Sequence, residues 1–224
     1  MFKFEKLVFG DLGWGDEFLF ATLMTITVSI LSMGLGLCLA ILTVWAKLIT
    51  NKITRLIANF YTTVVRGVPE LLVIYLIFFG GNTVVMSIAK LFGYHGYIEL
   101  NALTIGTIAI AFISATYSSE VLRAAYLAVN KGQIEAAKAL GLNKFQIFFK
   151  VMGPQILRHA LPGIGNVWQI TLKDTSLISV TGLVEIMRQT RIASNVEHSP
   201  LTFLVTAALL YLFCLLYTSD AADE

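Results

Sequence analysis

The chain has 224 residues, of which 57% are hydrophobic and only 13% are charged. Soluble domains carry about 25% charged residues, so this composition excludes an ordinary soluble fold, and the apolar content excludes a disordered chain. The 16 basic and 14 acidic residues give a net charge of +2, which is too balanced to favour nucleic acid as a partner. The length suits one domain, without room for a separate nucleotide-binding domain.

Five apolar segments predict an all-α integral membrane protein with about five transmembrane helices. The first segment, residues 18–46, contains no charged residue and is longer than the roughly 30 Å hydrocarbon core requires. Gly67-Val68-Pro69 predicts a break or kink in the second segment, and Lys173-Asp174 interrupts the fourth. The remaining segments are expected at about residues 59–79, 100–128, 160–184 and 201–217, so that one transmembrane domain covers residues 1–217.

The distribution of lysine and arginine predicts the orientation of the chain in the membrane. Eight of these residues lie in the loops that follow the first and third segments, and five lie on the other side. Because short cytoplasmic loops are enriched in basic residues, this modest bias places the N-terminus outside and the 129–159 loop in the cytoplasm.

This cytoplasmic loop reads KGQIEAAKALGLNKFQIFFKVMGPQILR over residues 131–158. A first short helix is expected to end at Gly141, and Asn143 is expected to cap a second helix over residues 144–152, which Gly153-Pro154 would end. Two apolar faces are expected, formed by Ile134, Ala137 and Leu140 and by Phe145, Phe148, Phe149 and Met152. An apolar face in such a loop requires a partner groove or, alternatively, the membrane surface.

Three acidic residues lie in apolar segments, where a charge is costly and commonly functional: Glu70, Glu120 and Asp174. Each also has a structural interpretation. Glu70 would lie at a helix start after Pro69, where free backbone N–H groups favour a carboxylate. Glu120 is three residues from Arg123, which permits an ion pair and favours the structural interpretation.

Asp174 is the acidic residue for which a functional role is slightly favoured. It lies in the fourth segment among hydroxyl side chains, which include Thr175 and Ser176. One carboxylate with several hydroxyls fits a polar cavity for a cationic, zwitterionic solute. In the structural alternatives, Asp174 pairs with Lys173 or caps a break in the fourth segment.

Motifs for catalysis are missing from the sequence. Nothing matches the phosphate-binding pattern GxxxxGK[ST], and no nucleophile motif or paired metal-ligand cluster is present. We therefore expect no catalytic residue, no bound metal or cofactor and no ATP hydrolysis by this chain. Uphill transport would then need energy from a partner.

Several motifs resemble those of ABC importer permeases. Glu135-Ala136-Ala137, with Gly141 four residues later and an apolar helix toward Pro154, resembles their EAA loop. Arg66-Gly67-Val68-Pro69-Glu70 is similar to a segment of the polar amino-acid permeases, and so are the stretches from Ala160 to Asn166 and from Leu172 to Ser179. These motifs occur in order over about residues 18–217, and the likeness is greatest to the histidine, arginine and octopine-type permeases.

The resemblance implies the fold of a type I ABC importer permease in the bacterial inner membrane. It implies that the loop is a coupling helix that docks on separate ATPase subunits, which hold ATP and Mg²⁺. A second permease, identical or similar, and an extracytoplasmic binding protein are the other implied partners, with basic amino acids as the solute. The fourth segment would contribute to the translocation path.

Local chemistry suggests roles for the residues of the EAA motif. A carboxylate at position 135 is favoured if it lies in the first turn of a helix, where it would hold the shape of the loop. Ala136 and Ala137 would permit close approach of a neighbouring helix, and Gly141 would be needed for the turn.

One segment departs from the family, and one rival function remains open. The acidic tail at residues 218–224 differs from the basic tail of the family, and no function is assigned to it. The rival is a secondary transporter or channel that needs no ATPase, which an inverted repeat would favour. The sequence contains no convincing repeat of this kind.

Overall fold

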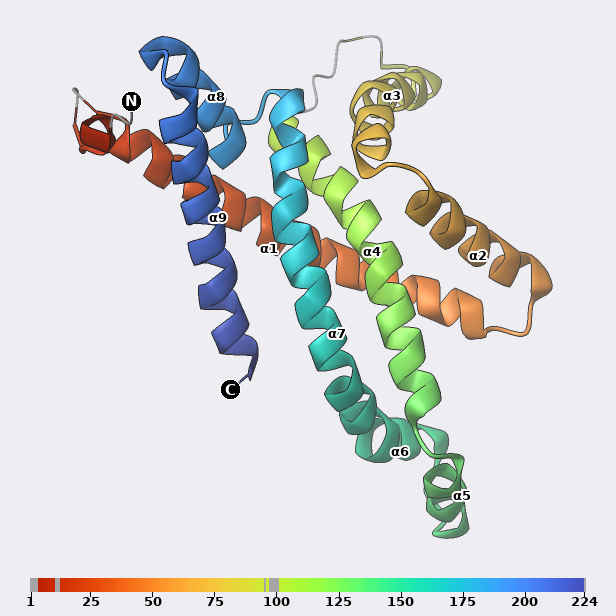
Figure 1. The fold of residues 1–224 in the computed structure, drawn as a ribbon. Helices are drawn as coiled ribbons and strands as arrows, with labels where there is room; N and C mark the ends of the chain where they lie inside the picture. The colour runs from red at the N-terminus through yellow and green to blue at the C-terminus, as the bar shows by residue number, and fades with distance from the viewer. Residues whose placement is uncertain (1–3, 11–12, 95, 97–100, 224) are drawn as a thin grey trace.

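The computed structural model describes residues 4–10, 13–94, 96 and 101–223. In these residues the regular elements are all helices, and none is a strand (Figure 1). Leu100, the expected start of the third segment, and Glu224 in the tail lie outside the described residues. The elements in chain order are η1 (Phe4–Leu7), α1 (Gly15–Leu48), α2 (Lys52–Gly67), α3 (Glu70–Leu91), α4 (Ala102–Ala128), α5 (Lys131–Ala139), α6 (Lys144–Ile147), η2 (Phe148–Met152), α7 (Gly153–Asp174), η3 (Thr175–Thr181), α8 (Ile186–Glu197) and α9 (Pro200–Asp223).

Asparagine side chains begin several of these helices. Asn51, Asn101 and Asn130 each accept a hydrogen bond from the backbone N–H two residues later, at distances between 2.8 and 3.0 Å. Such a cap satisfies a donor that the first turn of a helix leaves without a partner. The sequence therefore sets the starts of α2, α4 and α5 locally.

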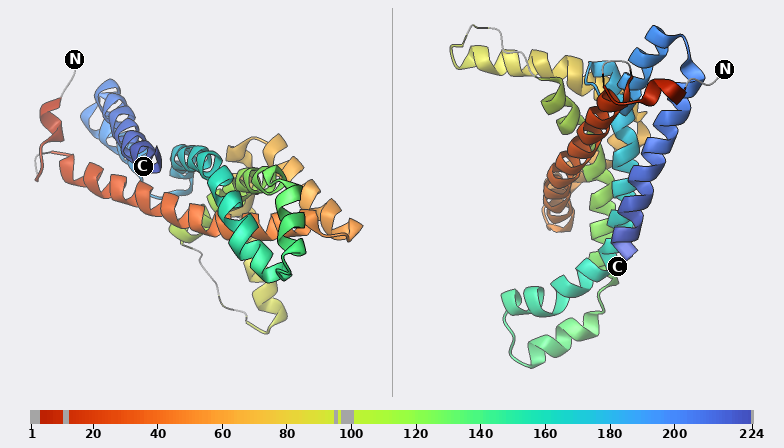
Figure 2. Two further views of the ribbon diagram at one scale, coloured as in Figure 1. Left: turned by 90° about the horizontal axis from the view of Figure 1, so that it is seen from below. Right: turned by 90° about the vertical axis from the view of Figure 1, so that its left-hand side faces the viewer.

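The centre of the fold is formed by α4 and α7, which lie side by side, with the long helix α1 crossing behind them (Figures 1 and 2). The 34 residues of α1 correspond to roughly 50 Å at 1.5 Å per residue, so a tilt is needed to fit a bilayer. Small residues bring α1 and α4 into close contact, because a side chain at Gly36 would collide with Ser114. This packing follows the general use of small residues between membrane helices.

The expected segment 59–79 is divided between two helices. Val68 is extended, with φ −107° and ψ 142°, and Pro69 precedes the first residue of α3, so the predicted break is confirmed. Both helices extend beyond the expected segment, since α2 begins at Lys52 and α3 continues to Leu91. Proline causes the break because its ring disfavours a helical conformation in the preceding residue.

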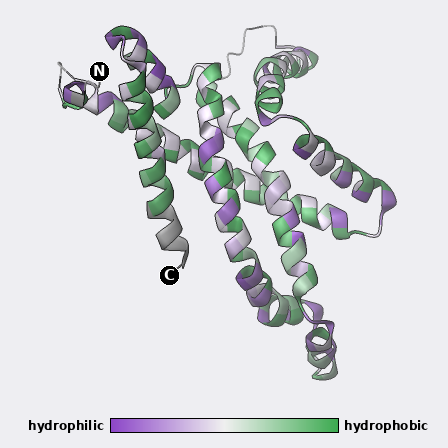
Figure 3. Cartoon of the chain, in the orientation of Figure 1, coloured by the Kyte–Doolittle hydropathy of each residue, from purple (hydrophilic) through white to green (hydrophobic). Residues whose placement is uncertain are grey.

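The expected segment 160–184 also has different bounds in the structure. The helix α7 begins at Gly153, and from Thr175 the chain continues as the tighter 3-10 helix η3. By length and hydropathy α1, α3 and α4 are able to cross a membrane, and Pro200–Leu216 forms a shorter apolar helix. The helix α7 is not among the helices that are apolar enough to cross a membrane, and Figure 3 shows hydrophilic residues along it.

The 131–152 loop and the N-terminal segment lie at opposite ends of the molecule (Figure 1). The elements α5 and α6 project beyond the ends of α4 and α7, as the right-hand view of Figure 2 makes clear. At the other end, η1 lies near α8, and Lys6 forms an ion pair with Glu197 at 3.4 Å. The fold therefore separates two terminal surfaces along the long axis of the bundle.

Candidate functional site

The 131–152 loop has the local geometry that its sequence predicts. Gly141 follows α5 with a φ of +77°, a conformation that costs residues with a Cβ atom. Asn143 then begins α6 with a reciprocal capping box, in which its side chain accepts from the backbone N–H of Gln146 and the Gln146 side chain accepts from the backbone N–H of Asn143. The predicted turn between two short helices is confirmed.

The apolar residues of the loop divide differently from the expected faces. Ala137, Ile147 and Met152 are buried in one cluster, together with Val129. The side chains that remain outside are Leu140, Phe145, Phe148 and Phe149, with exposed fractions of 81%, 73%, 47% and 58%. The two expected faces are therefore each divided: Met152 in η2 is buried while its expected neighbours Phe145, Phe148 and Phe149 are exposed, and Leu140 is exposed while Ala137 is buried.

The expected end of the second helix at Gly153-Pro154 is wrong. The chain stays helical from α6 through η2, a π-helical stretch over Phe148–Met152, and into α7. Pro154 lies in the first turn of α7, where its missing N–H is tolerated. The chain from α6 through η2 to α7 is therefore one continuous helical path that ends at Asp174.

The EAA residues occupy different environments. Ala137 is buried, whereas Glu135 and Ala136 are exposed, and Glu135 forms no ion pair among the described residues. Because α5 begins at Lys131, Glu135 lies beyond the first turn, where the helix dipole has little effect. The dipole explanation for Glu135 is therefore wrong, and its side chain points to solvent.

Two of the three acidic residues come together in the bundle. Asp174, at the end of α7, is buried, and its carboxyl group lies close to that of Glu70 at the start of α3. The Tyr117 hydroxyl on α4 donates a hydrogen bond of 2.9 Å to Glu70. Lys173 is exposed and forms no ion pair with Asp174 among the described residues. Three helices that are distant in sequence thus converge on one acidic site.

The neighbouring hydroxyl residues are less available than the sequence suggests. Thr175 is fully buried, and its hydroxyl donates a hydrogen bond of 2.7 Å to the carbonyl of Leu172. Ser176 is half-buried. Of these two residues, Ser176 is therefore the one with a surface toward solvent or a solute.

Glu120 lies apart from the acidic pair and has its own partners. It forms an ion pair with Lys47, which also donates a 2.8 Å hydrogen bond to Thr62, and a second ion pair with Arg123 at 3.7 Å. Lys47 is only 7% exposed, so this contact ties α1, α2 and α4 together. The structure supports the structural interpretation of Glu120, with Lys47 in the last turn of α1 as a second, buried partner beside Arg123.

Tyr117 and Glu185 are two polar residues that sequence reasoning missed. Glu185 is fully buried; it accepts hydrogen bonds from the backbone N–H groups of Met187 and Arg188 at 2.8 and 2.7 Å and from the Tyr211 hydroxyl at 2.9 Å. Glu185 caps α8. Its position directly before a helix was the sequence feature that could have indicated this role. Tyr117 gave no such signal, because an aromatic residue in an apolar segment is ordinary.

An open polar groove of about 450 Å³ lies between α2 and α4, and Tyr117 is one of the residues that line it. Its lining residues are Thr62, Thr63, Arg66, Gly67, Tyr117 and Glu120. The Arg66 guanidinium stacks over the Tyr117 ring, 5.4 Å from its centroid. Arg66, Glu70, Tyr117 and Asp174 form what we name the polar cluster.

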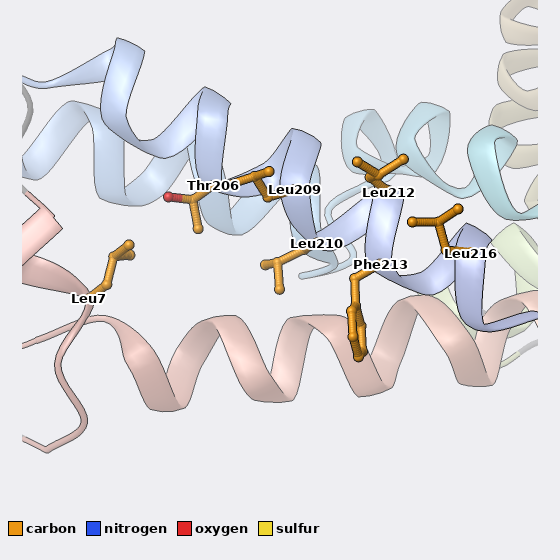
Figure 4. Close-up of a pocket in the computed structure, with 7 residues that line it drawn as sticks. All are labelled: Leu7, Thr206, Leu209, Leu210, Leu212, Phe213 and Leu216. Atoms are coloured by element: carbon orange, nitrogen blue, oxygen red, sulfur yellow. The ribbon is translucent and has the colours of Figure 1, made fainter.

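A second groove, of about 520 Å³, is apolar and lies along α9 next to the N-terminal segment (Figure 4). It is lined by Leu7, Thr206, Leu209, Leu210, Leu212, Phe213 and Leu216. Such walls suit hydrocarbon and offer a charged solute no counter-charge. In the described residues, no group of three or more His, Cys, Asp and Glu side chains is arranged to hold a metal ion.

Comparison with known proteins places the chain among transport permeases. Residues 32–219 match the family described as binding-protein-dependent transport system inner membrane component. The nopaline transport system permease protein NocQ of Agrobacterium fabrum (strain C58) is 50% identical over 92% of this chain and 88% of that protein. The histidine/lysine/arginine/ornithine transport system permease protein HisQ of Escherichia coli (strain K12) is 36% identical over 89% of this chain and 87% of that protein.

A solved structure agrees with this assignment. An amino acid ABC transporter crystallised with histidines has a chain that superposes with a TM-score of 0.80 at 28% identity, covering 94% of this chain and 92% of that chain. The expected all-α fold of a type I importer permease is therefore confirmed. The chain belongs to the family of binding-protein-dependent transport system inner membrane components.

Proposed function

We propose that this chain is the permease subunit of an ATP-driven importer for basic amino acids. The names of the relatives support this solute class, since they include nopaline, octopine and histidine/lysine/arginine/ornithine transport systems. The acidic pair Glu70 and Asp174 adds a chemical reason, because a cationic solute would give these two neighbouring acidic side chains a counter-charge. Asp174, Glu70 and Ser176 line the solute path in this proposal, with Thr175 and Glu120 as structural supports.

The observation that carries the ATP-driven mechanism is the exposed apolar surface of residues 131–152, which we name the docking loop. Leu140, Phe145, Phe148 and Phe149 are between 47% and 81% exposed, and the three phenylalanine rings pack on one another. Large aromatic residues that protrude in this way act as anchors in the pocket of a protein partner. A separate ATPase subunit, holding ATP and Mg²⁺, is the partner that the family supplies.

The arrangement of the two ends supports the remaining partners. With the docking loop in the cytoplasm, the N-terminus and α8 face the outside, where a solute-binding protein delivers its cargo. A second permease, identical or similar, completes the pathway around the polar groove. ATP-driven closure of the ATPase subunits moves the docking loops and alternates access to the solute site.

The rival proposal, a secondary transporter or channel, gives the docking loop no role. Its exposed phenylalanines would then lie on the membrane surface.

Reconstitution in liposomes tests the proposal. We expect the purified chain alone to hydrolyse no ATP. With its ATPase subunits, hydrolysis and arginine uptake should rise together when the binding protein and arginine are added. Hydrolysis by the chain alone, or arginine uptake without any ATPase subunit, would contradict the proposal in favour of the rival.

A further inference from the structure

Glu185 is a fully buried acidic residue outside the polar cluster, and it joins two helices. Its carboxyl oxygens accept hydrogen bonds from the backbone N–H groups of Met187 and Arg188, at 2.8 and 2.7 Å, which begin α8. The Tyr211 hydroxyl on α9 donates a hydrogen bond of 2.9 Å to one of the same oxygens. A carboxyl group without exposure to water needs such donors in its place. The Tyr211 hydroxyl therefore attaches α9 to the cap of α8.

The start of α8 is also attached to η3 and to α1. The Arg188 guanidinium donates a hydrogen bond of 3.2 Å to the carbonyl of Ser179 in η3. The backbone N–H of Ile186 donates one of 3.3 Å to the hydroxyl of Thr25 on α1. Between η3 and α8 the chain turns at Gly182, which has a φ of +99°. Side-chain contacts thus fasten α8 across a turn made by a glycine.

The element η3 connects these contacts to the solute site. It begins directly after Asp174, the buried acidic residue of the polar cluster. Tyr211 lies close to Thr175, the first residue of η3, as well as donating to Glu185. One tyrosine therefore touches both ends of the connection between Asp174 and α8. As long as its contacts hold, a displacement of η3 is passed on to α8.

We propose that Glu185 and Tyr211 are positioning residues for transport, which hold α8 to η3 so that the outer end of the path and the solute site move as one unit. Alternating access requires the outer end to open and close in step with the solute site. Without these contacts, the turn at Gly182 would let α8 move independently, since glycine has the widest choice of backbone conformations. The inference rests on the proposed function and deepens it by naming the residues that keep the outer end in step with the ATPase cycle.

The test measures how much arginine the complete importer takes up in proteoliposomes for each ATP that it hydrolyses. Tyr211→Phe removes the hydroxyl that binds Glu185 and keeps the ring. We expect hydrolysis to continue while the arginine taken up per ATP falls about threefold or more, as the loss of one buried hydrogen bond allows. A variant that is merely less abundant or less stable would lower both rates together and leave their ratio unchanged.

Hydrogen–deuterium exchange on the same complex follows the movement itself. When the ATPase subunits are trapped with ATP and vanadate, peptides from η3 and from α8 should change their exchange together in the wild type. In Tyr211→Phe, η3 should still respond to trapping and α8 should not. Loss of stability alone would instead raise the exchange of α8 in the trapped and the free complex alike.

Two further variants separate this role from a general loss of packing. Tyr61→Phe is the matched control, because its hydroxyl also forms a hydrogen bond between helices, of 2.6 Å from α2 to the carbonyl of Phe112 on α4. It should leave the uptake per ATP unchanged. Arg188→Gln removes the contact with Ser179 and should lower the uptake per ATP, though less than Tyr211→Phe. Arg188→Gln decides the question if Tyr211→Phe does not reach the membrane.

The inference is overturned if Tyr211→Phe, or Arg188→Gln in its place, keeps the wild-type uptake per ATP. It is also overturned if Tyr61→Phe lowers this ratio as much, or if η3 and α8 respond separately to trapping in the wild type. Arginine uptake by the wild-type importer tests the proposed function separately. Normal ATP-dependent uptake with an unchanged ratio in the variants rejects this inference alone. Absence of such uptake for every basic amino acid rejects the proposed function, and the inference with it.

Discussion

The docking loop presents large apolar side chains to water, whereas the polar cluster holds a buried and a half-buried acidic side chain, those of Asp174 and Glu70, in the helix bundle. Phe145 is 73% exposed at one end of the molecule, and Asp174 is 9% exposed near its centre. Each arrangement is costly in an isolated chain. Exposed apolar side chains are disfavoured by water, and acidic side chains are disfavoured in the apolar interior of a helix bundle. The cost indicates that each region is completed by something outside this chain.

The two regions require different kinds of partner. The docking loop has buried its own core of Ala137, Ile147 and Met152, so its remaining apolar side chains are available for a protein surface. The polar cluster instead has hydrogen-bonding groups that are partly satisfied among themselves, and its open groove suits a small charged solute. The continuous path through η2 and α7 joins the two regions mechanically.

The largest effect is expected from Gly141→Asp in the docking loop. The φ of +77° strains any residue with a Cβ by on the order of 1 kcal/mol, which leaves the fold intact, while a charged side chain now projects from the turn toward the partner. No atom of the described residues lies within 4 Å of a Cβ built there, so a collision inside the chain is not the cause. We expect normal amounts of protein in the membrane and abolished uptake.

Gly141→Ala serves as its graded control, because it adds the same strain with a small apolar side chain. It should retain most of the uptake, as measured with labelled arginine. Wild-type uptake by the aspartate variant would refute the docking assignment.

The next largest effect is expected from Asp174→Asn in the polar cluster. The asparagine keeps the size and hydrogen bonding but removes a charge, and uptake of arginine, lysine or histidine should fall about tenfold or more. Uptake of a neutral amino acid such as glutamine, if it is carried, should fall much less. Membrane abundance must be measured beside both, since the rival account makes Asp174 a scaffold.

If uptake of basic and neutral solutes falls equally, Asp174 is a structural residue. The same conclusion follows if the variant is present in normal amounts and its preference among solutes is unchanged. The exposed position of Lys173, without an ion pair to Asp174 among the described residues, already removes its expected structural partner.

A pair of substitutions in the docking loop tests which apolar side chains face the partner. Phe149→Ser removes a 58% exposed side chain and should weaken ATPase association with little change in thermal stability. Ile147→Ala removes a buried side chain and should destabilise the loop by about 2–5 kcal/mol. Association is followed by co-purification and stability by thermal unfolding. If instead Ile147→Ala weakened ATPase association and Phe149→Ser lowered the thermal stability, the docking surface would lie on the other face of the loop.

The smallest functional effect is expected from the ion pair of Glu120. Lys47→Met should lower the thermal stability, because it leaves a carboxylate without its main partner, while the preference among solutes stays the same. Adding Glu120→Gln should recover part of the lost stability. A change in solute preference by either variant would place Glu120 in the solute path and widen the polar cluster.

The sequence by itself determined the features that depend on neighbouring residues. Apolar segment lengths indicated a membrane protein, Gly67-Val68-Pro69 indicated the helix break, and Gly141 with Asn143 indicated the turn of the docking loop. Caps, breaks and positive φ values involve groups a few residues apart, so they leave a local pattern.

The tertiary structure alone decided the contacts between distant residues. The meeting of Glu70 with Asp174 and the stack of Arg66 on Tyr117 follow from how α2, α3, α4 and α7 pack. In the same way, packing of α5 against α6 and η2 buries Met152 and leaves Leu140 exposed, although helical periodicity had grouped Met152 with the phenylalanines and Leu140 with Ala137. Sequence spacing records which residues share a helix face, but which face is covered depends on helices that lie far away in the chain.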